Sequence, residues 1–353
     1  MNQHIQNIEI SNFKSIKDLK VIDLNEINII VGPPNSGKSN LLEAVSLFSL
    51  PYLDISENTK LNNFIRYQNL GDLVFNQNMT NTDSYVSRTI NGEEDKFLLK
   101  YDFKGNFPLL NIIRQKDKEF LFHIDYKSQI RQTGNYFSYY SFVKEDTNYT
   151  IEYPTLKYFY DGKDHDSVFW NKRLMPFFGE NLGMMVLQIK ELQEFVANEF
   201  EKLGLDLVIN KQTGEISAQR KQSDFLVTSV PFTVLADTFR RILFYKAAIL
   251  SNEESVLLFE EPEAYCYEPY ILEFTKEIIH NKNKNQFFIV THSDFIINEL
   301  VNDLETKEKI NIYLTNFSKE RGTEVKLLKK YKEDVYDYGM SVFMNFESLW
   351  EEN

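Results

Sequence analysis

Residues 32–39 combine glycines, a lysine and a serine at the spacing G-x-x-x-x-G-K-S. Glycines let the backbone curl, so that its N–H groups and the start of a following helix converge on an anionic phosphate. In this motif Lys38 would reach the β- and γ-phosphates of a nucleotide, and the Ser39 hydroxyl would bind Mg²⁺. The motif lies between an apolar run and a segment with helical apolar spacing, which is the context it needs. We therefore expect ATP and phosphate to be bound by Gly32, Pro33, Pro34, Asn35, Ser36, Gly37, Lys38, Ser39 and Asn40.

Two adjacent glutamates follow another short apolar run. Residues 256–259 are Val-Leu-Leu-Phe, and Glu260 and Glu261 come directly after them. Such a run indicates a buried strand, which would deliver both carboxylates to the sheet edge where open α/β folds bind ligands. We expect Glu260 to hold Mg²⁺, directly or through water, and Glu261 to polarise the attacking water as general base or orienting group. The alternative is a solvated strand end.

A histidine ends a further apolar run. Residues 287–290 are Phe-Phe-Ile-Val, and Thr291, His292 and Ser293 follow. A neutral imidazole at this strand end could hydrogen-bond the γ-phosphate or the attacking water. A lone histidine is more often structural, so the assignment depends on the two motifs above. On that basis His292 joins Glu261 as a predicted catalytic residue.

Strands and helices must position these residues, and hydrophobic periodicity indicates where they lie. Strands are expected at residues 5–13, 27–31, 256–259 and 286–290. Helices are expected after Ser39 and at residues 239–250 and 270–280. This alternation of strands and helices is typical of a largely parallel sheet.

The middle of the chain has a different pattern. Short alternating runs such as 97–101 and 120–124 are separated by turn residues, which predicts antiparallel strands. One continuous amphipathic helix is expected at residues 182–203, ended by Gly204, with a hairpin after it. We predict an α/β fold of the P-loop NTPase class, with a mixed sheet, an antiparallel β lobe and a helical insertion. The predicted domains are an ATPase core at residues 1–70 and 230–353, the β lobe at 71–160, and the helical and hairpin insertion at 161–229.

Together, these segments resemble the ABC-type ATPases of the SMC/RecF-like branch. The nearest resemblance is to stand-alone AAA-family ATPases related to the ATPase half of OLD-family nucleases. Residues 8–15 (Ile-Glu-Ile-Ser-Asn-Phe-Lys-Ser) resemble the first strand and "NFKS" turn of that branch. Residues 259–264 (Phe-Glu-Glu-Pro-Glu-Ala), with Pro269, resemble its "DEPEAHLHP" segment, and residues 291–293 resemble its histidine switch.

The resemblance implies an ABC ATPase head that uses ATP and Mg²⁺ and forms a homodimer, or a higher homo-oligomer, around two ATP molecules. A signature motif on one copy would then contact the γ-phosphate held by the other. The matching position here is Ala236, Asp237 and Thr238, in a segment without glycine, whereas such signatures usually contain it. Asp237 is also a good helix N-cap residue, which would explain it without any contact to ATP. The glutamine that completes such sites is either Gln68 or Gln77.

Composition narrows the possible partners and surroundings. The chain carries 39 Lys and Arg against 52 Asp and Glu, a formal net charge of −13. Such a surface repels a phosphate backbone, so unaided DNA binding over the whole surface is not expected. Cys266 is the only cysteine, which fits a reducing compartment. Without a leader pattern or an apolar run of membrane length, we expect a cytoplasmic protein that does not engage a membrane.

Three functional hypotheses follow. The first is an ATP-hydrolysing subunit that dimerises around ATP and controls a separate effector, a nuclease or toxin, in bacterial anti-phage defence; this context comes from the resemblance. Residues after His292 contain no Asp-x-Asp pair for catalytic metals, so we expect no nuclease activity of its own. The second is a RecF-like, ATP-gated DNA-binding repair protein. The third, suggested by the glycine-free signature, is a nucleotide-sensing scaffold with little turnover.

Overall fold

The computed structural model describes residues 4–52, 60–79, 84–105, 107–115, 120–125, 127–132, 154–163, 172–304 and 306–353. Its larger sheet is formed by β1 (Ile5–Phe13), β2 (Ile16–Val21), β3 (Ile27–Val31), β4 (Ser84–Ile90), β5 (Glu93–Lys104), β6 (Phe107–Arg114), β7 (Phe120–Ile124), β8 (Ile130–Gln132), β9 (Thr155–Tyr158), β13 (Val256–Glu260), β14 (Gln286–Val290), β15 (Ile310–Ser318) and β16 (Gly322–Leu327). A smaller sheet is formed by β10 (Asp206–Ile209), β11 (Ile216–Ser223) and β12 (Leu226–Pro231). The α-helices are α1 (Lys38–Ser46), α3 (Leu182–Gln188), α4 (Lys190–Lys202), α5 (Asp237–Ser251), α6 (Glu268–Ile279), α7 (Asp294–Asn302), α8 (Lys332–Tyr338) and α9 (Phe346–Glu352).

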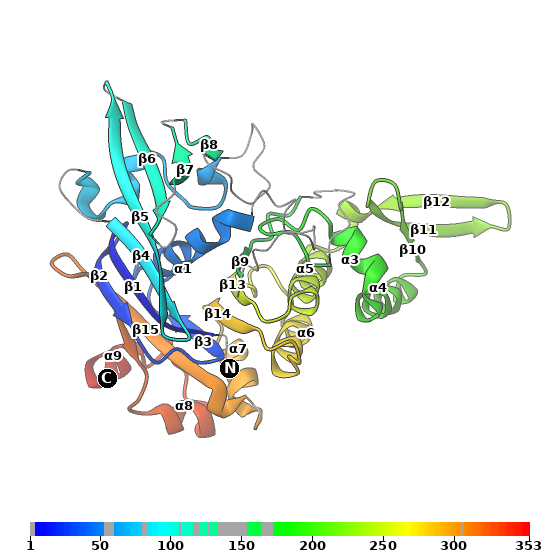
Figure 1. Cartoon of the computed structure of the whole chain (residues 1–353). Coiled ribbons are helices and arrows are strands. Elements are labelled where there is room, and N and C mark those ends of the chain that lie inside the picture. Colours follow the sequence, from blue (N-terminus) through cyan, green and yellow to red (C-terminus); the bar gives the residue numbers. More distant parts are fainter. Residues whose placement is uncertain are drawn as a thin grey trace.

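Within the described residues, the large sheet has the strand order β8-β7-β6-β5-β4-β1-β2-β16-β15-β3-β14-β13-β9. The stretch from β15 to β9 is parallel, and the other neighbours pair antiparallel. Figure 1 shows the antiparallel strands β5 and β6 extending from one end of the molecule, while the β11–β12 hairpin projects at the other. The predicted α/β fold with a mixed sheet and antiparallel strands is confirmed.

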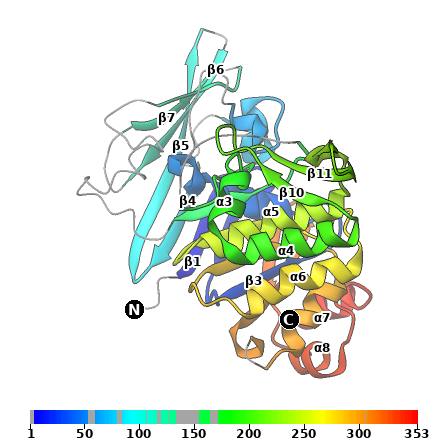
Figure 2. The same cartoon turned by 90° about the vertical axis from the view of Figure 1, so that its right-hand side faces the viewer.

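The parallel strands are buried on both faces, because their side chains alternate between two apolar cores. Ile29 and Leu257 belong to the core on the side of α5, α6 and α7. Ile30 and Leu258 belong to the core on the side of α1. Figure 2 shows α4, α5 and α6 in front of the sheet, as expected when a parallel sheet needs cover on both faces.

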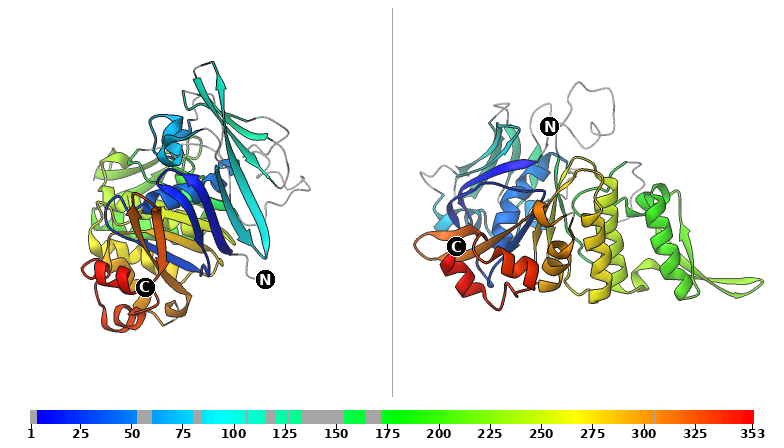
Figure 3. Two further views of the ribbon diagram at one scale, coloured as in Figure 1. Left: turned by 90° about the vertical axis from the view of Figure 1, so that its left-hand side faces the viewer. Right: turned by 90° about the horizontal axis from the view of Figure 1, so that it is seen from below.

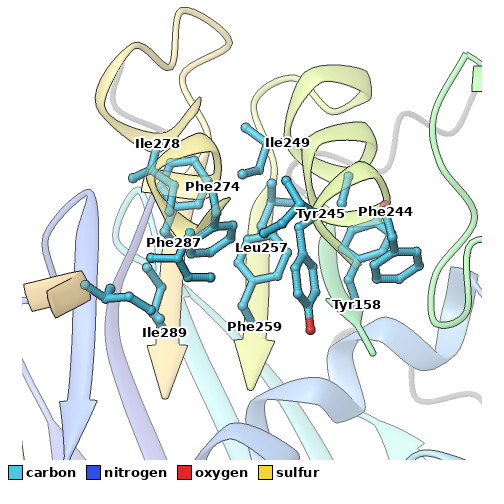
Figure 4. Packing of buried hydrophobic residues seen from close by; sticks show 14 of the residues in the cluster. Tyr158, Phe244, Tyr245, Ile249, Leu257, Phe259, Phe274, Ile278, Phe287 and Ile289 are labelled. Atoms are coloured by element: carbon cyan, nitrogen blue, oxygen red, sulfur yellow. The ribbon is translucent and has the colours of Figure 1, made fainter. Parts of the chain in front are cut away.

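Aromatic rings fill the interface between α5, α6 and the sheet. Tyr245 and Phe274 project from the two helices onto Phe259 of β13 (Figure 4). Their ring centroids lie 5.4 and 5.3 Å from that of Phe259, in edge-on arrangements. Such arrangements are favoured by the ring quadrupoles and add to the stabilisation from buried area. This packing fixes the strand that ends in Glu260.

The C-terminal segments pack beside β15 and β16, which lie in the interior of the large sheet. Figure 3 shows the C-terminal helices (red) next to these two strands (orange). Lys326 Nζ of β16 donates a hydrogen bond of 2.7 Å to the Trp350 carbonyl oxygen of α9. No helix in the described part of the chain is both long and apolar enough to cross a membrane.

The prediction of a single helix at residues 182–203 is wrong. The structure has two helices, α3 and α4, because Ile189 between them adopts an extended backbone conformation (φ −105°, ψ 113°). Residues 183–186 of α3 are all buried, so α3 is enclosed on every side, whereas α4 buries only one stripe, Leu192, Val196 and Phe200. Packing of this segment against the core therefore overrides its helical periodicity.

Local periodicity locates the other elements near the site correctly. The strands predicted at residues 5–13, 27–31 and 286–290 match β1, β3 and β14. The expected domain division remains a proposal; β9, which it assigns to the antiparallel lobe, pairs in parallel with β13.

Replacing Phe274 with alanine should lower the free energy of unfolding by about 3–5 kcal/mol, the usual cost of truncating a buried phenylalanine. Phe274 is fully buried between the sheet and α5, so a cavity would remain. Urea unfolding followed by circular dichroism measures the change. Phe225→Ala is the matched control, because Phe225 is 99% exposed. If both variants were equally stable, this account of the core would be wrong.

Candidate active site

The three predicted motifs follow three adjacent parallel strands. β14 lies between β3 and β13, with Val290 aligned to Ile30 on one side and to Glu260 on the other. The glycine loop after β3, the histidine after β14 and the acidic pair at the end of β13 therefore meet at one sheet edge. This is the edge at which open α/β folds bind ligands.

Close packing makes the glycines of the loop necessary. Gly37 has φ 97°, and a Cβ atom there would lie 2.0 Å from Thr323 Oγ1 of β16. A Cβ atom on Gly32 would lie 2.3 Å from the Thr315 carbonyl oxygen of β15. Only glycine fits both positions without a shift of the neighbouring strands.

Lys38 closes the loop onto itself. Its ammonium donates hydrogen bonds to the carbonyl oxygens of Gly32 (2.8 Å) and Pro33 (2.9 Å). Burial lowers the pKa of Lys38, against the opposing fields of Glu261 and Glu260. A buried ammonium beside a helix start that has no side-chain cap is complementary to an anion. The loop therefore fits a nucleotide phosphate.

The remaining loop residues divide into supporting and outward-facing ones. Ser36 Oγ bonds Thr315 Oγ1 (2.8 Å), and Asn40 Nδ2 donates to Ser15 Oγ (2.6 Å). Pro34 and Asn35 are exposed, with Asn35 in a left-handed conformation. The side chains of Ser36 and Asn40 thus brace the loop against β15 and against the turn after β1.

Glu260 is the metal-ligand candidate, and Ser39 lies close to its carboxylate. The Ser39 hydroxyl is near enough to this carboxylate to help lower the pKa of Glu260. Burial favours the neutral form, but Lys157 (Nζ–Oε2 3.6 Å) and Arg66, which bonds Oε1, outweigh it and lower the pKa of Glu260. Glu260 is therefore an anion with one hydroxyl beside it, a hard-oxygen pair that fits Mg²⁺.

Charged residues that the sequence did not single out surround this pair. Glu43 of α1 is fully buried; it bonds the Lys14 ammonium and accepts from Arg66 Nε at 2.9 Å. Arg66 thus bridges Glu43 and Glu260, and Lys157 flanks Glu260 from β9. Residues 155–158 are Thr-Leu-Lys-Tyr, so no apolar run marks Lys157, and nothing local in the sequence marks Arg66.

Glu261 and His292 face each other across the ends of β13 and β14. His292 Nε2 lies 3.6 Å from Glu261 Oε1, and the two side chains are 41% and 46% exposed. Glu261 has a left-handed backbone (φ 46°), and its N–H donates to the Val290 carbonyl oxygen at 2.8 Å. The His292 ring also stacks on Phe343, with centroids 6.1 Å apart. The structure therefore brings the two predicted catalytic residues together beside the loop.

The signature position begins α5, but the predicted N-cap role of Asp237 is wrong. Ala236 is the N-cap, and Asp237 is the first helical residue, with its carboxylate on Arg240 and Arg241 (3.3 and 3.4 Å). These arginines draw the carboxylate along the helix, so it does not cap the N-terminal N–H groups. Thr238 Oγ1 donates to the Tyr265 carbonyl oxygen (3.1 Å), which links α5 to the turn after the acidic pair.

The two glutamine candidates lie on one short segment beyond Arg66. Gln68 is exposed, and its backbone N–H donates to Asp72 Oδ2 at 3.0 Å. The Gln77 side-chain amide donates to Asp72 Oδ1 at 2.9 Å. Gln68 is two residues from Arg66, which contacts Glu260, whereas the Gln77 side-chain amide is already bonded to Asp72.

Two curated proteins match short stretches of the chain. One is an uncharacterized protein of Methanocaldococcus jannaschii, 50% identical over 44 residues, which are 12% of this chain and 20% of that protein. The other is an ATP/GTP phosphatase of Helicobacter pylori, 51% identical over 41 residues, 12% of this chain and 11% of that protein. The chain therefore covers a fifth or less of the length of either relative.

Solved structures of SMC head domains superpose over most of the chain at low identity. An SMC head bound to the C-winged helix domain of ScpA is 14% identical, with 93% of this chain and 99% of that one covered and a TM-score of 0.49. The SMC head domain of Thermotoga maritima is 12% identical, with 92% and 99% covered and a TM-score of 0.40. Both TM-scores are below 0.5.

The family model of the AAA ATPase domain matches residues 4–211, more than half of the chain. The match includes the glycine loop, Arg66 and Lys157, and ends before the acidic pair and His292. It confirms the ATPase family predicted from the motifs, while the relation to OLD-family nucleases stays a prediction. This chain belongs to the AAA ATPase domain family.

Proposed function

We propose that this chain binds ATP with Mg²⁺ and hydrolyses it to ADP and phosphate. One observation carries the proposal: the ends of β3, β13 and β14 place Lys38, Glu260 with Ser39, and the Glu261–His292 pair at a single sheet edge. Phosphoryl transfer needs mainly positioning and charge stabilisation, which these groups can supply. The ATP/GTP phosphatase that matches a short stretch of the chain agrees with this activity.

Each residue has a defined task in this proposal. Lys38 exchanges its two carbonyl acceptors for phosphate oxygens, and the N–H groups of the loop bind the same anion. Mg²⁺, when bound, would be held by Ser39 and Glu260 and would neutralise negative charge on the phosphates. Glu261 accepts a proton from the attacking water or orients it. His292, at the end of the neighbouring strand, hydrogen-bonds the γ-phosphate or the same water.

We propose further that two copies associate around ATP. The Glu261 and His292 side chains are half-exposed, so the site is open on the side where the phosphate chain would end. Ala236 at the start of α5 is exposed as well and could approach the nucleotide of a second copy. The function of such a dimer, in this proposal, is to control a separate effector protein in bacterial anti-phage defence, in the cytoplasm. That context rests on the sequence resemblance and the single cysteine.

The dimer is tested with Glu261→Gln, which should trap bound ATP because hydrolysis is slowed while the binding loop is intact. Multi-angle light scattering should show a monomer-sized species without nucleotide and a dimer with ATP and Mg²⁺. Glu261→Gln combined with Lys38→Ala is the control and should stay monomeric with ATP. A mass that is independent of ATP in both proteins would refute the shared-site proposal. Co-purification with the product of the neighbouring gene, with and without ATP, then tests the effector.

One observation favours the alternative of a nucleotide-sensing scaffold with slow turnover. Arg66 bonds Glu260, the proposed metal ligand, and Lys157 flanks the same carboxylate. A divalent cation near these two positive charges would be repelled, so Arg66 must move before the metal binds. A single-turnover measurement distinguishes the two functions, since a scaffold would release phosphate slowly even with saturating ATP.

A further inference from the structure

Glu263 connects the turn after the acidic pair to the turn that carries His292. Its Oε1 atom accepts a hydrogen bond from the His292 backbone N–H at 2.7 Å and another from Thr291 Oγ1 at 2.8 Å. Its Oε2 atom is buried and has no hydrogen-bond partner among the described residues. We propose that Glu263 is a positioning residue, which sets the distance between His292 and Glu261 in the hydrolysis reaction. This inference rests on the function proposed above.

The contacts around Thr291 make this link stiff. Thr291 is fully buried; its hydroxyl donates to Glu263 and accepts from the Ser293 N–H at 3.0 Å. Ser293 in turn caps α7 by accepting from the Ile296 N–H at 3.4 Å. A movement of Glu263 would therefore be passed to the His292 backbone and to the start of α7.

The other end of the link is fixed by the turn itself. Glu261 donates through its backbone N–H to Val290 of β14, and Glu263 accepts from the Cys266 N–H at 2.9 Å through its carbonyl oxygen. Glu261 and Glu263 thus leave the same turn in different directions: Glu261 towards the open site and Glu263 beneath His292. The 3.6 Å separation of His292 Nε2 and Glu261 Oε1 depends on both.

A purely structural role explains the carboxyl group poorly. Burial raises the pKa of Glu263, and the hydrogen bonds from His292 and Thr291 offset this only in part. An ionised carboxylate at this position therefore carries a desolvation cost that an apolar side chain would avoid. Only a hydrogen-bond acceptor at this position can form the two hydrogen bonds that orient residues 291 and 292.

The role predicts an effect on turnover rather than on ATP binding. No hydrogen bond or ion pair described for Glu263 involves Lys38, Ser39 or Glu260. Glu263→Ala should therefore lower kcat by about 10-fold to 100-fold, the usual result of misplacing a reacting group by about 1 Å, with KM for ATP within about threefold. Glu263→Gln retains an oxygen acceptor of the same length and should recover most of this loss. Glu268→Ala, at an exposed glutamate on the same turn-and-helix segment, is the control.

A double-mutant cycle with His292→Ala identifies the residue through which Glu263 acts. If Glu263 positions His292, adding Glu263→Ala to His292→Ala should cost less than about threefold more, because the positioned group is already gone. Should Glu263→Ala fold poorly by circular dichroism, Thr291→Val removes the second donor to Glu263 and replaces it in the cycle.

The outcomes separate this inference from the proposed function. If the two substitutions lowered kcat independently, so that their fold-losses multiplied in the double variant, the positioning role of Glu263 would be overturned. A wild-type kcat for Glu263→Ala would overturn it as well. In both cases the catalytic role of His292 would remain. A wild-type kcat for His292→Ala would overturn both the catalytic role of His292 and this inference. If only Lys38→Ala and Glu261→Gln lost activity, the ATPase proposal would hold and the positioning role of Glu263 would be refuted.

Discussion

Lys38→Ala should abolish ATP binding at micromolar nucleotide. Lys38 is the only positively charged side chain in residues 32–40, and its ammonium is buried against the loop it would share with the phosphates. A charge-assisted bond from a partly desolvated ammonium to a phosphate is much stronger than a neutral one. Alanine removes the charge and the donor together, and no other cation of the loop can replace it. Isothermal titration calorimetry with ATP and Mg²⁺ measures the loss.

Two controls keep this result interpretable. Lys190→Ala removes an exposed lysine of α4, 83% accessible at its side chain, and should bind ATP like the unmodified protein. Circular dichroism of Lys38→Ala should show an intact fold, because the carbonyl oxygens of Gly32 and Pro33 can be hydrated once the side chain is gone. Unchanged affinity in a folded Lys38→Ala protein would refute the assignment of the loop.

Glu261→Gln should preserve ATP binding and lower the hydrolysis rate by about 10²–10⁴-fold, the usual contribution of a positioned base. Glutamine keeps the size and shape of the side chain but cannot accept a proton. Glu261 lies beside His292 at the open end of the site and makes no described ion pair with Arg66 or Lys157, so its removal leaves the charges around Glu260 in place. Phosphate release under single-turnover conditions measures the chemical step directly.

Glu260→Gln provides the contrast. It removes the proposed metal ligand, so its defect should be partly rescued by higher Mg²⁺ concentration, whereas that of Glu261→Gln should not. Glu268→Gln, an exposed position nearby, should hydrolyse ATP normally. If Glu260→Gln and Glu261→Gln both turned over at the normal rate, the interpretation of the acidic pair would be wrong.

Much of the site could be predicted because its parts are locally encoded. The loop follows the three apolar residues 29–31, the acidic pair follows the four apolar residues 256–259, and Thr291 and His292 follow the four apolar residues 287–290. The strands β3, β13 and β14 are found where those runs lie. A buried parallel strand must be apolar on both faces, so its end is visible in the sequence wherever polar residues begin. That these three ends would meet followed from the rule that parallel strands present their carboxyl ends at one edge.

The family match includes one of the three motifs that the local sequence patterns predicted. It covers residues 4–211, which contain the glycine loop and its flanking strand and helix. The acidic pair and His292 lie outside it, so their roles remain proposals that the variants above test.

The sequence by itself determined the strand–loop–helix unit, the strand ends and the residue types that could bind a phosphate and a cation. Only the tertiary structure decided which distant charges complete the site: Arg66 between Glu43 and Glu260, Lys157 beside Glu260, and Glu263 beneath His292. It also broke the helix at Ile189 and made Ala236 the N-cap in place of Asp237. Periodicity and capping preferences are short-range properties of the chain, whereas an ion pair or a helix break depends on which segments packing brings together, and that is set by the whole fold.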